Sequence, residues 1–315
     1  MSYNNQNTWK VIMNKLPHPY RFTDSYQPAE EWWTWNQDRI HLDTFRNPEA
    51  SAKIILLHGV GTNGRQISLI AGGPLFKRGF ETIMIDMPTY GMTEVTDRNN
   101  VTYADWVQIA SDFIDAEAAQ DDRPIFLYGL SAGGMETYHI ACINRKVKGI
   151  IGMTFLDQRL QIVRDETTNN MFMSRVGVPA TTISKKMGLG RLTLPMKLTS
   201  KMNALCNDQE LMKVFLKDKT SAGNKASMNF LDSYMNYKPA IEAEDFNVCP
   251  VLLTQPEQDR WTPLHLSTPF LEQIKKVPVE IVILPNGGHY PVEPEALNVM
   301  NESIMNFINK AQTST

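Results

Sequence analysis

The chain has 315 residues, enough for one large α/β domain with an insertion or for two ordinary domains. Its formal net charge is -3 and 21% of its residues are charged, so it lacks the basic excess of a nucleic-acid-binding protein. The N-terminus is polar, and no uncharged apolar run approaches the ~18 residues that a membrane span needs. The three cysteines are scattered, which favours a reducing compartment over a disulfide framework. We therefore expect a cytoplasmic protein without a membrane span or a nucleic-acid partner.

The first thirty residues carry no clear periodicity and are expected to be irregular. Trp32, Trp33 and Trp35 then precede a turn at residues 36–38, and residues 40–45 alternate strictly between apolar and polar side chains. This pattern predicts a β-hairpin. Its tryptophans are expected to pack on an edge strand, and a ligand-binding surface is the alternative.

Short apolar runs alternate with helical patterns along the first half of the chain. A strand buried on both faces has this continuous apolar character, and the runs are too short for helices. One intervening helix is expected to begin at Thr102, where Asp105 completes a capping box. Strands that alternate with helices imply right-handed crossovers and a mostly parallel sheet with helices on both faces. The runs are residues 53–58, 80–86, 124–128 and 149–156.

The alternation stops after about residue 164 and resumes near residue 248. Between them the sequence is Met-rich, helix-prone and without a strong strand. Residues 165–240 hold nine lysines and two arginines against six acidic residues, a mildly basic balance. Flexible methionine side chains suit an irregular pocket for acyl chains, and an ordinary helical core is an equally good interpretation.

The sheet pattern resumes with predicted strands at residues 248–254 and 279–284, and a closing helix is expected from Pro294 to about Gln312. We therefore divide the chain into three segments. They are the first part of an α/β core with its N-terminal hairpin (1–164), a helical Met-rich cap (165–245) and the second part of the core (246–315).

The sequence Gly-Leu-Ser-Ala-Gly at residues 129–133 directly follows a predicted buried strand and precedes a helical pattern. A serine on such a tight turn presents its hydroxyl at the N-terminal end of the helix. There, backbone N–H groups and the helix dipole favour developing negative charge. The flanking glycines let neighbouring backbone pass close to the turn. A glycine-rich connection with a surface serine is the plain alternative.

Ser131, Asp259 and His289 each lie just past the end of a predicted buried strand. In a parallel sheet these ends gather on one edge, so the three side chains can meet there. A serine hydroxyl is a weak nucleophile until an imidazole takes its proton, and the imidazole needs a carboxylate to fix its tautomer. The three residues are therefore a candidate catalytic triad. Asp157, after the preceding strand, is a reserve candidate for the acid.

Over about residues 50–295 the chain resembles the α/β-hydrolase superfamily, in which the triad follows the same order of serine, acid and histidine. The placement of the cap after the sixth strand is similar to that of monoacylglycerol-lipase-like and lysophospholipase-like esterases. One departure is Gln255-Pro256, where a glycine is usual before the acid. The resemblance rests on His58-Gly59, Asp86 with Pro88, Tyr90 and Gly91, Gly129-x-Ser131-x-Gly133, residues 250–253 with Asp259 and Pro263, and Gly288-His289 with Pro291.

The resemblance implies an oxyanion hole made by the backbone N–H groups of Val60 and Ala132. Its supporting loop would contain His58 and Gly59, with the histidine in a structural rather than a catalytic role. A phosphate-binding loop is the rival interpretation of residues 59–64, and the missing Gly-Lys-Ser/Thr argues against it. Asp86 is expected to hold its own loop by hydrogen bonds.

We expect a serine hydrolase that cleaves a carboxylic ester of a hydrophobic acyl substrate through an acyl-enzyme. A lactonase that opens N-acyl-homoserine lactones with the same triad is the first alternative, and a catalytically silent ligand-binding protein is the second. The basic cap argues against a peptidase, and a serine nucleophile argues against dehalogenases and epoxide hydrolases. The sequence holds no metal-ligand cluster or cofactor motif, so no metal or cofactor is expected. The expected partner is a small acyl ester or acyl lactone, and the oligomeric state stays open.

Overall fold

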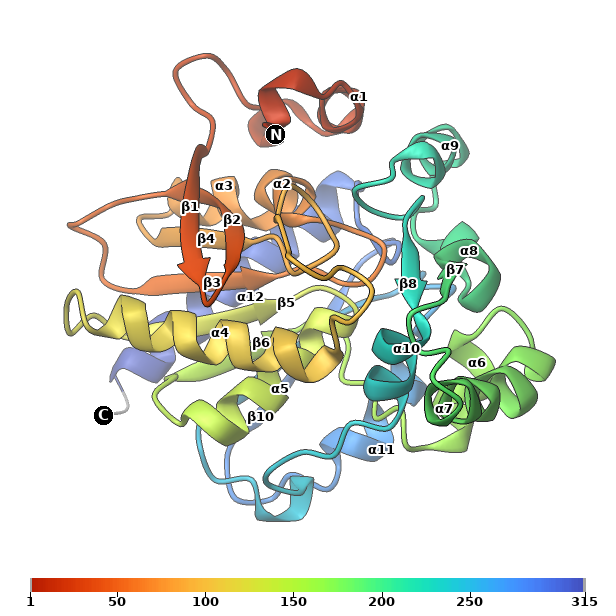
Figure 1. Cartoon of the computed structure of the whole chain (residues 1–315). Coiled ribbons are helices and arrows are strands. Elements are labelled where there is room, and N and C mark those ends of the chain that lie inside the picture. The colour runs from red at the N-terminus through yellow and green to blue at the C-terminus, as the bar shows by residue number, and fades with distance from the viewer. Residues whose placement is uncertain (1, 314–315) are drawn as a thin grey trace.

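The structure, a computed structural model, describes residues 2–313 (Figure 1). Its main sheet has the strand order β1-β2-β4-β3-β5-β6-β9-β10. Neighbouring strands from β4 to β10 pair in parallel, whereas β1 and β2 form an antiparallel hairpin and β2 pairs antiparallel with β4. The predicted hairpin and mostly parallel sheet are confirmed. The strands are β1 (Ala29–Trp35), β2 (Asp38–Phe45), β3 (Lys53–Leu57), β4 (Glu81–Ile85), β5 (Ile125–Gly129), β6 (Gly149–Gly152), β9 (Val251–Pro256) and β10 (Val279–Leu284).

Helices cover both faces of this sheet, with α4 and α5 on one face and α3 and α12 on the other (Figure 1). The four strands from β3 to β6 are buried along their whole length, so the core lies on both sides of the sheet centre. The predicted capping box is present, because Thr102 and Asp105 each accept a hydrogen bond from the other's backbone N–H. The core helices after the hairpin are α2 (Gly64–Ile67), α3 (Gly73–Phe76), α4 (Tyr103–Ala118), α5 (Ala132–Asn144), α11 (Thr268–Leu271) and α12 (Pro294–Thr313).

The expectation of an irregular N-terminus was wrong for residues 8–15, which form helix α1 (Thr8–Lys15). Trp9 and Ile12 are buried on one side of this helix, and the buried Leu16 just after the helix continues that side. The period of three to four residues was present in the sequence but too short to stand out. Tyr3, further upstream, is fully buried and donates its hydroxyl to Asp86.

The tryptophans of the edge strand β1 attach the hairpin to helix α4. The ring of Trp33 packs edge-to-face on Phe113, with ring centroids 5.1 Å apart. The indole N–H of Trp35 donates to Asp112 at 2.8 Å. These contacts favour packing over a ligand-binding surface.

Strand β6 ends at Gly152, although its apolar run continues to Leu156. Beyond Met153 the chain makes hydrogen bonds to residues that lie outside the neighbouring strands. The hydroxyl of Thr154 donates to the Ser131 carbonyl, and the Phe155 N–H donates to the Ser267 hydroxyl. The end of the predicted strand is therefore a buried loop.

Residues 153–250, which we call the insert, connect β6 to β9, and the proposed cap (165–245) lies within them. Two short strands here pair antiparallel, a feature that the sequence analysis missed because three-residue strands give no periodic signal. Within the described residues, no helix combines the length and apolarity needed to cross a bilayer. The insert contains α6 (Gln161–Thr167), a π-helical turn (Met173–Gly177), α7 (Val178–Lys186), β7 (Thr193–Pro195), α8 (Met196–Thr199), α9 (Gln209–Lys217), β8 (Lys225–Ser227) and α10 (Met228–Met235).

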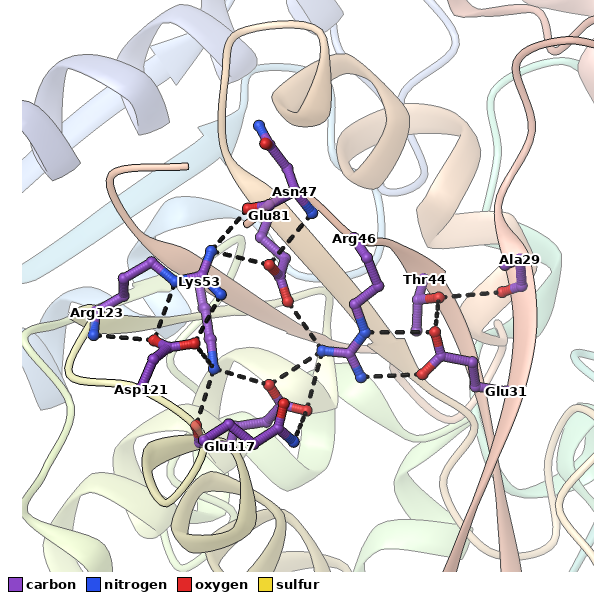
Figure 2. A network of polar contacts seen from close by, with 11 residues as sticks. Ala29, Glu31, Thr44, Arg46, Asn47, Lys53, Glu81, Glu117, Asp121 and Arg123 are labelled. Atoms are coloured by element: carbon purple, nitrogen blue, oxygen red, sulfur yellow. Dashed lines mark hydrogen bonds and ion pairs between the residues drawn. The ribbon is translucent and has the colours of Figure 1, made fainter. Parts of the chain in front are cut away.

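A network of ion pairs lies at the start of β3, at the end of the sheet opposite Ser131 (Figure 2). The buried Lys53 ammonium lies 3.1 Å from a Glu117 carboxylate oxygen and 2.9 Å from one of Asp121. Arg46 also contacts Glu117, so this buried carboxylate has two cationic partners. The network joins the start of β3 to the end of α4.

Candidate active site

Ser131 occupies a strained turn between β5 and α5. Its φ of 56° and ψ of -124° place a non-glycine residue in a region that costs about 1–3 kcal/mol. A Cβ at Gly129 would lie 1.9 Å from the Gly133 carbonyl oxygen, and one at Gly133 would lie 2.5 Å from the Leu57 carbonyl oxygen. Only glycine fits at either position, which explains the Gly-x-Ser-x-Gly pattern. The surrounding backbone thus holds Ser131 in its strained conformation.

Asp259 follows β9, His289 follows β10, and their side chains meet. His289 Nδ1 lies 2.8 Å from Asp259 Oδ2. The other carboxylate oxygen accepts hydrogen bonds from the backbone N–H groups of Trp261 and Thr262, each at 2.8 Å. The Thr262 hydroxyl donates to Oδ2 at 2.8 Å. These hydrogen bonds fix the orientation of the Asp259 carboxylate.

The electrostatics of this pair fix the tautomer of His289. Burial by itself raises the pKa of Asp259, but the charge and hydrogen bond of His289 and the hydrogen bonds from Thr262 outweigh it, so this pKa is lowered. An ionised carboxylate only accepts hydrogen bonds, so Nδ1 of a neutral His289 carries the proton and Nε2 has a free lone pair. Among residues 2–313, the buried Nε2 has no hydrogen-bond partner. It is thus available as a base.

Ser131 lines a cavity whose wall also contacts the Asp259–His289 pair. Ser131, Trp261 and Thr262 line it, and the Trp261 ring packs on the His289 ring with centroids 4.8 Å apart. Ser131 and His289 do not form a hydrogen bond with each other in the structure. Catalytic hydrogen bonds are often long without substrate and tighten when it binds.

The reserve candidate for the acid pairs with an arginine and not with His289. Asp157 forms an ion pair of 2.8 Å with Arg159 and also accepts a hydrogen bond from the Arg159 backbone N–H. Asp259, not Asp157, is the carboxylate in contact with His289.

The loop after β3 packs directly on the turn that carries Ser131. A Cβ at Gly59 would lie 2.7 Å from Ser131 Cβ and 3.2 Å from the Ala132 nitrogen. Val60 lines the same cavity as Ser131. Among the residues that the structure describes, neither the Val60 nor the Ala132 N–H has a hydrogen-bond acceptor. Two donors without acceptors thus belong to two segments in contact, the loop after β3 and the turn that carries Ser131.

His58 holds the loop after β3 in place through both of its ring nitrogens. Its Nε2 accepts a hydrogen bond from the Met87 N–H at 2.9 Å, and its Nδ1 lies 2.8 Å from the Gly59 carbonyl oxygen. The ring is fully buried, and burial lowers its pKa. A neutral histidine with both nitrogens in use has a structural role, and it joins the loops after β3 and β4.

Asp86 holds the same two loops together. Its carboxylate accepts hydrogen bonds from the backbone N–H groups of Gly64 at 2.7 Å and Met92 at 2.8 Å. These bonds agree with the expected role of Asp86. The Tyr3 hydroxyl adds a contact that the sequence did not suggest.

The cavity above Ser131 has a volume of about 220 Å³, and its other walls come largely from the insert. Four methionines line it: Met173, Met196, Met228 and Met235. Met202 and Met212 instead lie in the core. The methionines of the insert therefore serve both as pocket wall and as helical core.

The cavity wall is less polar than its composition suggests. Five of its hydroxyl side chains donate to backbone carbonyls of their own segments, so their hydroxyls are already in use. They are Thr167, Thr168, Thr181, Thr199 and Ser200. Gln158 is the exception, because its Oε1 is buried without a hydrogen-bond partner among the described residues. Its Nε2 donates to the Tyr234 hydroxyl at 3.4 Å.

The sequence analysis did not single out Thr262, Gln158 or Tyr234. An aspartate often accepts hydrogen bonds from backbone two and three residues later, so the turn after Asp259 could have pointed to Thr262. Nothing in the local sequence marks Gln158 or Tyr234. Within residues 2–313, no group of His, Cys, Asp and Glu side chains has a geometry that could hold a metal ion.

The model of a family described as "Alpha/beta hydrolase family" matches residues 54–300. No curated protein matches the sequence. A soluble variant of monoglyceride lipase from Saccharomyces cerevisiae, solved with a substrate analog, is 16% identical with a TM-score of 0.70, over 94% of this chain and 99% of that one. The monoacylglycerol lipase of Paleococcus ferrophilus is 22% identical with a TM-score of 0.65, over 86% of this chain and 99% of that one. Est1E from Butyrivibrio proteoclasticus, with ferulic acid bound, is 18% identical with a TM-score of 0.60, over 90% and 99%. At these identities the likeness shows the fold, and the expected α/β-hydrolase fold is confirmed.

Proposed function

We propose that this chain, which belongs to the alpha/beta hydrolase family, is a serine hydrolase that cleaves a carboxylic ester of a hydrophobic acyl substrate. The observation that carries the proposal is the Asp259–His289 pair beside the cavity of Ser131, with His289 Nε2 free to accept a proton. This is the arrangement of groups that acyl transfer to serine requires.

In the proposed reaction, Ser131 Oγ attacks the ester carbonyl carbon while His289 Nε2 takes the hydroxyl proton. The negative charge moves to the carbonyl oxygen, where the N–H groups of Val60 and Ala132 donate to it. Each such donor lowers the barrier by about 3 kcal/mol. The ionised Asp259 stabilises the imidazolium. The tetrahedral intermediate then collapses: the bond between the carbonyl carbon and the alcohol oxygen breaks, the imidazolium protonates that oxygen, and the acyl group stays on Ser131.

Water completes the cycle. His289 takes a proton from a water molecule, and the resulting hydroxide attacks the acyl-enzyme carbonyl. The second tetrahedral intermediate collapses, the carboxylic acid leaves, and Ser131 regains its proton from His289. None of these steps uses a metal or a cofactor.

The cavity favours a hydrophobic acyl group. Its methionines and its internally bonded hydroxyls present apolar surface, which a fatty acyl chain would bury. The likeness to monoglyceride lipases points in the same direction. An open ester with an apolar acyl chain is thus our first candidate.

An N-acyl lactone opened by the same residues is the second candidate. The observation that favours it is the Gln158 side chain, whose buried Oε1 has no hydrogen-bond partner in the described part of the chain. The amide N–H of an N-acyl lactone could donate to this oxygen, whereas a simple fatty ester has no such donor.

The test is hydrolysis of a long-acyl p-nitrophenyl ester and of an N-acyl-homoserine lactone by the wild type and by Ser131→Ala. We expect turnover of the open ester and loss of nearly all activity in the variant. A much higher kcat/KM for the lactone would make the protein a lactonase. Binding of either compound by both proteins, with turnover by neither, would contradict the proposal and favour a silent binding protein.

A further inference from the structure

The outer side of the insert carries a concentration of exposed apolar side chains. Nine of the thirteen exposed large hydrophobic side chains in residues 2–313 lie between Ile162 and Leu198, and we call these nine the apolar face. The most exposed are Phe172 at 68% and Met187 at 70%. Large exposed apolar patches on proteins usually mark contact with a partner or a membrane.

These side chains belong to one connected layer. Helix α6, the π-helical turn and α7 contact one another in sequence order. The N–H groups of Asn169 and Lys201 donate to the carbonyls of Thr199 and Thr167, which joins the end of α6 to the end of α8. In Figure 1 the same elements form the side of the molecule away from the hairpin strands β1 and β2.

The charge of this layer is mostly positive. Its acidic residues, Asp165 and Glu166 in α6, pair with Arg175 and His265. Residues 167–207 contain six lysines and arginines and no aspartate or glutamate. Three of the cations pair with acidic residues outside this range. The other three, Lys186, Lys197 and Lys201, have no acidic partner among residues 2–313. The apolar face is thus accompanied by uncompensated positive charge.

We propose that the apolar face docks on the surface of an anionic lipid bilayer. Apolar side chains enter the boundary between headgroups and acyl chains, and nearby lysines bind anionic headgroups. A second copy of this chain fits the face less well, because it would bring the same three lysines into the contact. The charges therefore select a negatively charged surface.

The opposite side of the same layer faces the cavity. Met173, Val178 and Met196 line the cavity, while Phe172 and Met187 of the same layer are exposed. Docking would place this layer, which forms part of the cavity wall, against the bilayer. The docking itself does not depend on the proposed ester hydrolysis.

The test is co-sedimentation of the full chain with vesicles of phosphatidylcholine alone and of phosphatidylcholine with phosphatidylserine. We expect binding to the anionic vesicles, and weaker binding at high salt. The triple variant Lys186→Gln/Lys197→Gln/Lys201→Gln should bind them roughly 100-fold more weakly, from the usual contribution of each lysine near an anionic membrane. Phe172→Ser/Met187→Ser should also reduce binding, because it removes the inserting side chains.

The matched control is Lys148→Gln/Lys238→Gln/Lys275→Gln, which makes the same change in net charge at exposed positions elsewhere. It should bind like the wild type, and all variants should hydrolyse a short dissolved ester at the wild-type rate. The proposal is overturned if the wild type binds neither kind of vesicle or if both triple variants lose binding equally. It is also overturned if sedimentation velocity shows a dimer that Phe172→Ser/Met187→Ser dissociates, since the face would then be an interface between copies.

Discussion

His289 Nδ1 lies 2.8 Å from Asp259 Oδ2, and Asp157 instead pairs with Arg159. Asp259→Asn should therefore lower kcat by roughly 1,000- to 10,000-fold at neutral pH, because an amide can hold the imidazole in the wrong tautomer. KM should change little, since Asp259 lies behind the histidine. Steady-state kinetics with an ester substrate measure both constants. Asp157→Asn is the control and should keep kcat within a few-fold of the wild type; an equal loss in both variants would contradict the assignment of the acid.

His41 makes stability depend on pH. Burial by itself lowers the pKa of His41, but the carboxylates of Asp86 and Glu30 outweigh it and raise this pKa to about 9. Its Nδ1 lies 2.9 Å from Asp86 Oδ2, and its Nε2 lies 3.0 Å from Glu30 Oε2. Because the folded pKa exceeds the unfolded value of 6.5, the stabilisation is complete below pH 6.5 and is lost as pH rises through 9.

Urea denaturation across this interval should show the free energy of unfolding falling by up to about 3 kcal/mol. In His41→Asn the protein should be less stable at pH 6, and its stability should change much less with rising pH. If both proteins show the same dependence, another group is responsible.

Glu136 should make the folded protein less stable as pH rises, whereas a carboxylate paired with a cation makes it more stable. It is fully buried, neither of its oxygens has a hydrogen-bond partner among the described residues, and burial raises its pKa well above 4.5. The folded state keeps a proton that the unfolded state releases above pH 4.5, so this group makes stability fall as pH rises.

Glu136→Gln removes that titration. The free energy of unfolding of the variant relative to the wild type should rise from about pH 4.5 upward, by at most about 1.4 kcal/mol per pH unit. Chemical denaturation at a series of pH values measures the difference. The exposed Glu272→Gln should show no such trend, and a constant difference for Glu136→Gln would mean that its carboxyl is ionised in the folded protein.

Lys53 should matter for stability and not for catalysis. Replacement by Met leaves the buried Glu117 with Arg46 as its remaining cationic partner, so we expect a loss of about 3 kcal/mol. The ester kinetics of the folded variant should match the wild type, since Lys53 begins β3 at the far end of the sheet from Ser131. Lys213→Met, which breaks an exposed pair with Glu210, should cost less than about 1 kcal/mol. Similar losses in both variants would contradict the role of burial.

The sequence by itself determined the elements of the sheet and the position of the serine. The apolar runs before residues 58, 86 and 129 predicted buried strands because both faces of those strands are covered, a property that local sequence records. The glycines around Ser131 marked the strained turn, because a Cβ at these positions would collide with neighbouring backbone. Helix α1 and the strands β7 and β8 were too short to give a periodic signal.

The tertiary structure alone decided which side chains meet. Asp157 and Asp259 both follow strands of the same sheet, and only the conformations of their loops bring one to His289 and the other to Arg159. The Tyr3 contact with Asp86 likewise joins residues 83 positions apart. The apolar face and the cavity wall come from opposite sides of the same helices, and the packing of the insert determines which side is exposed. Contacts between distant residues depend on where the backbone places them, and no local pattern encodes that placement.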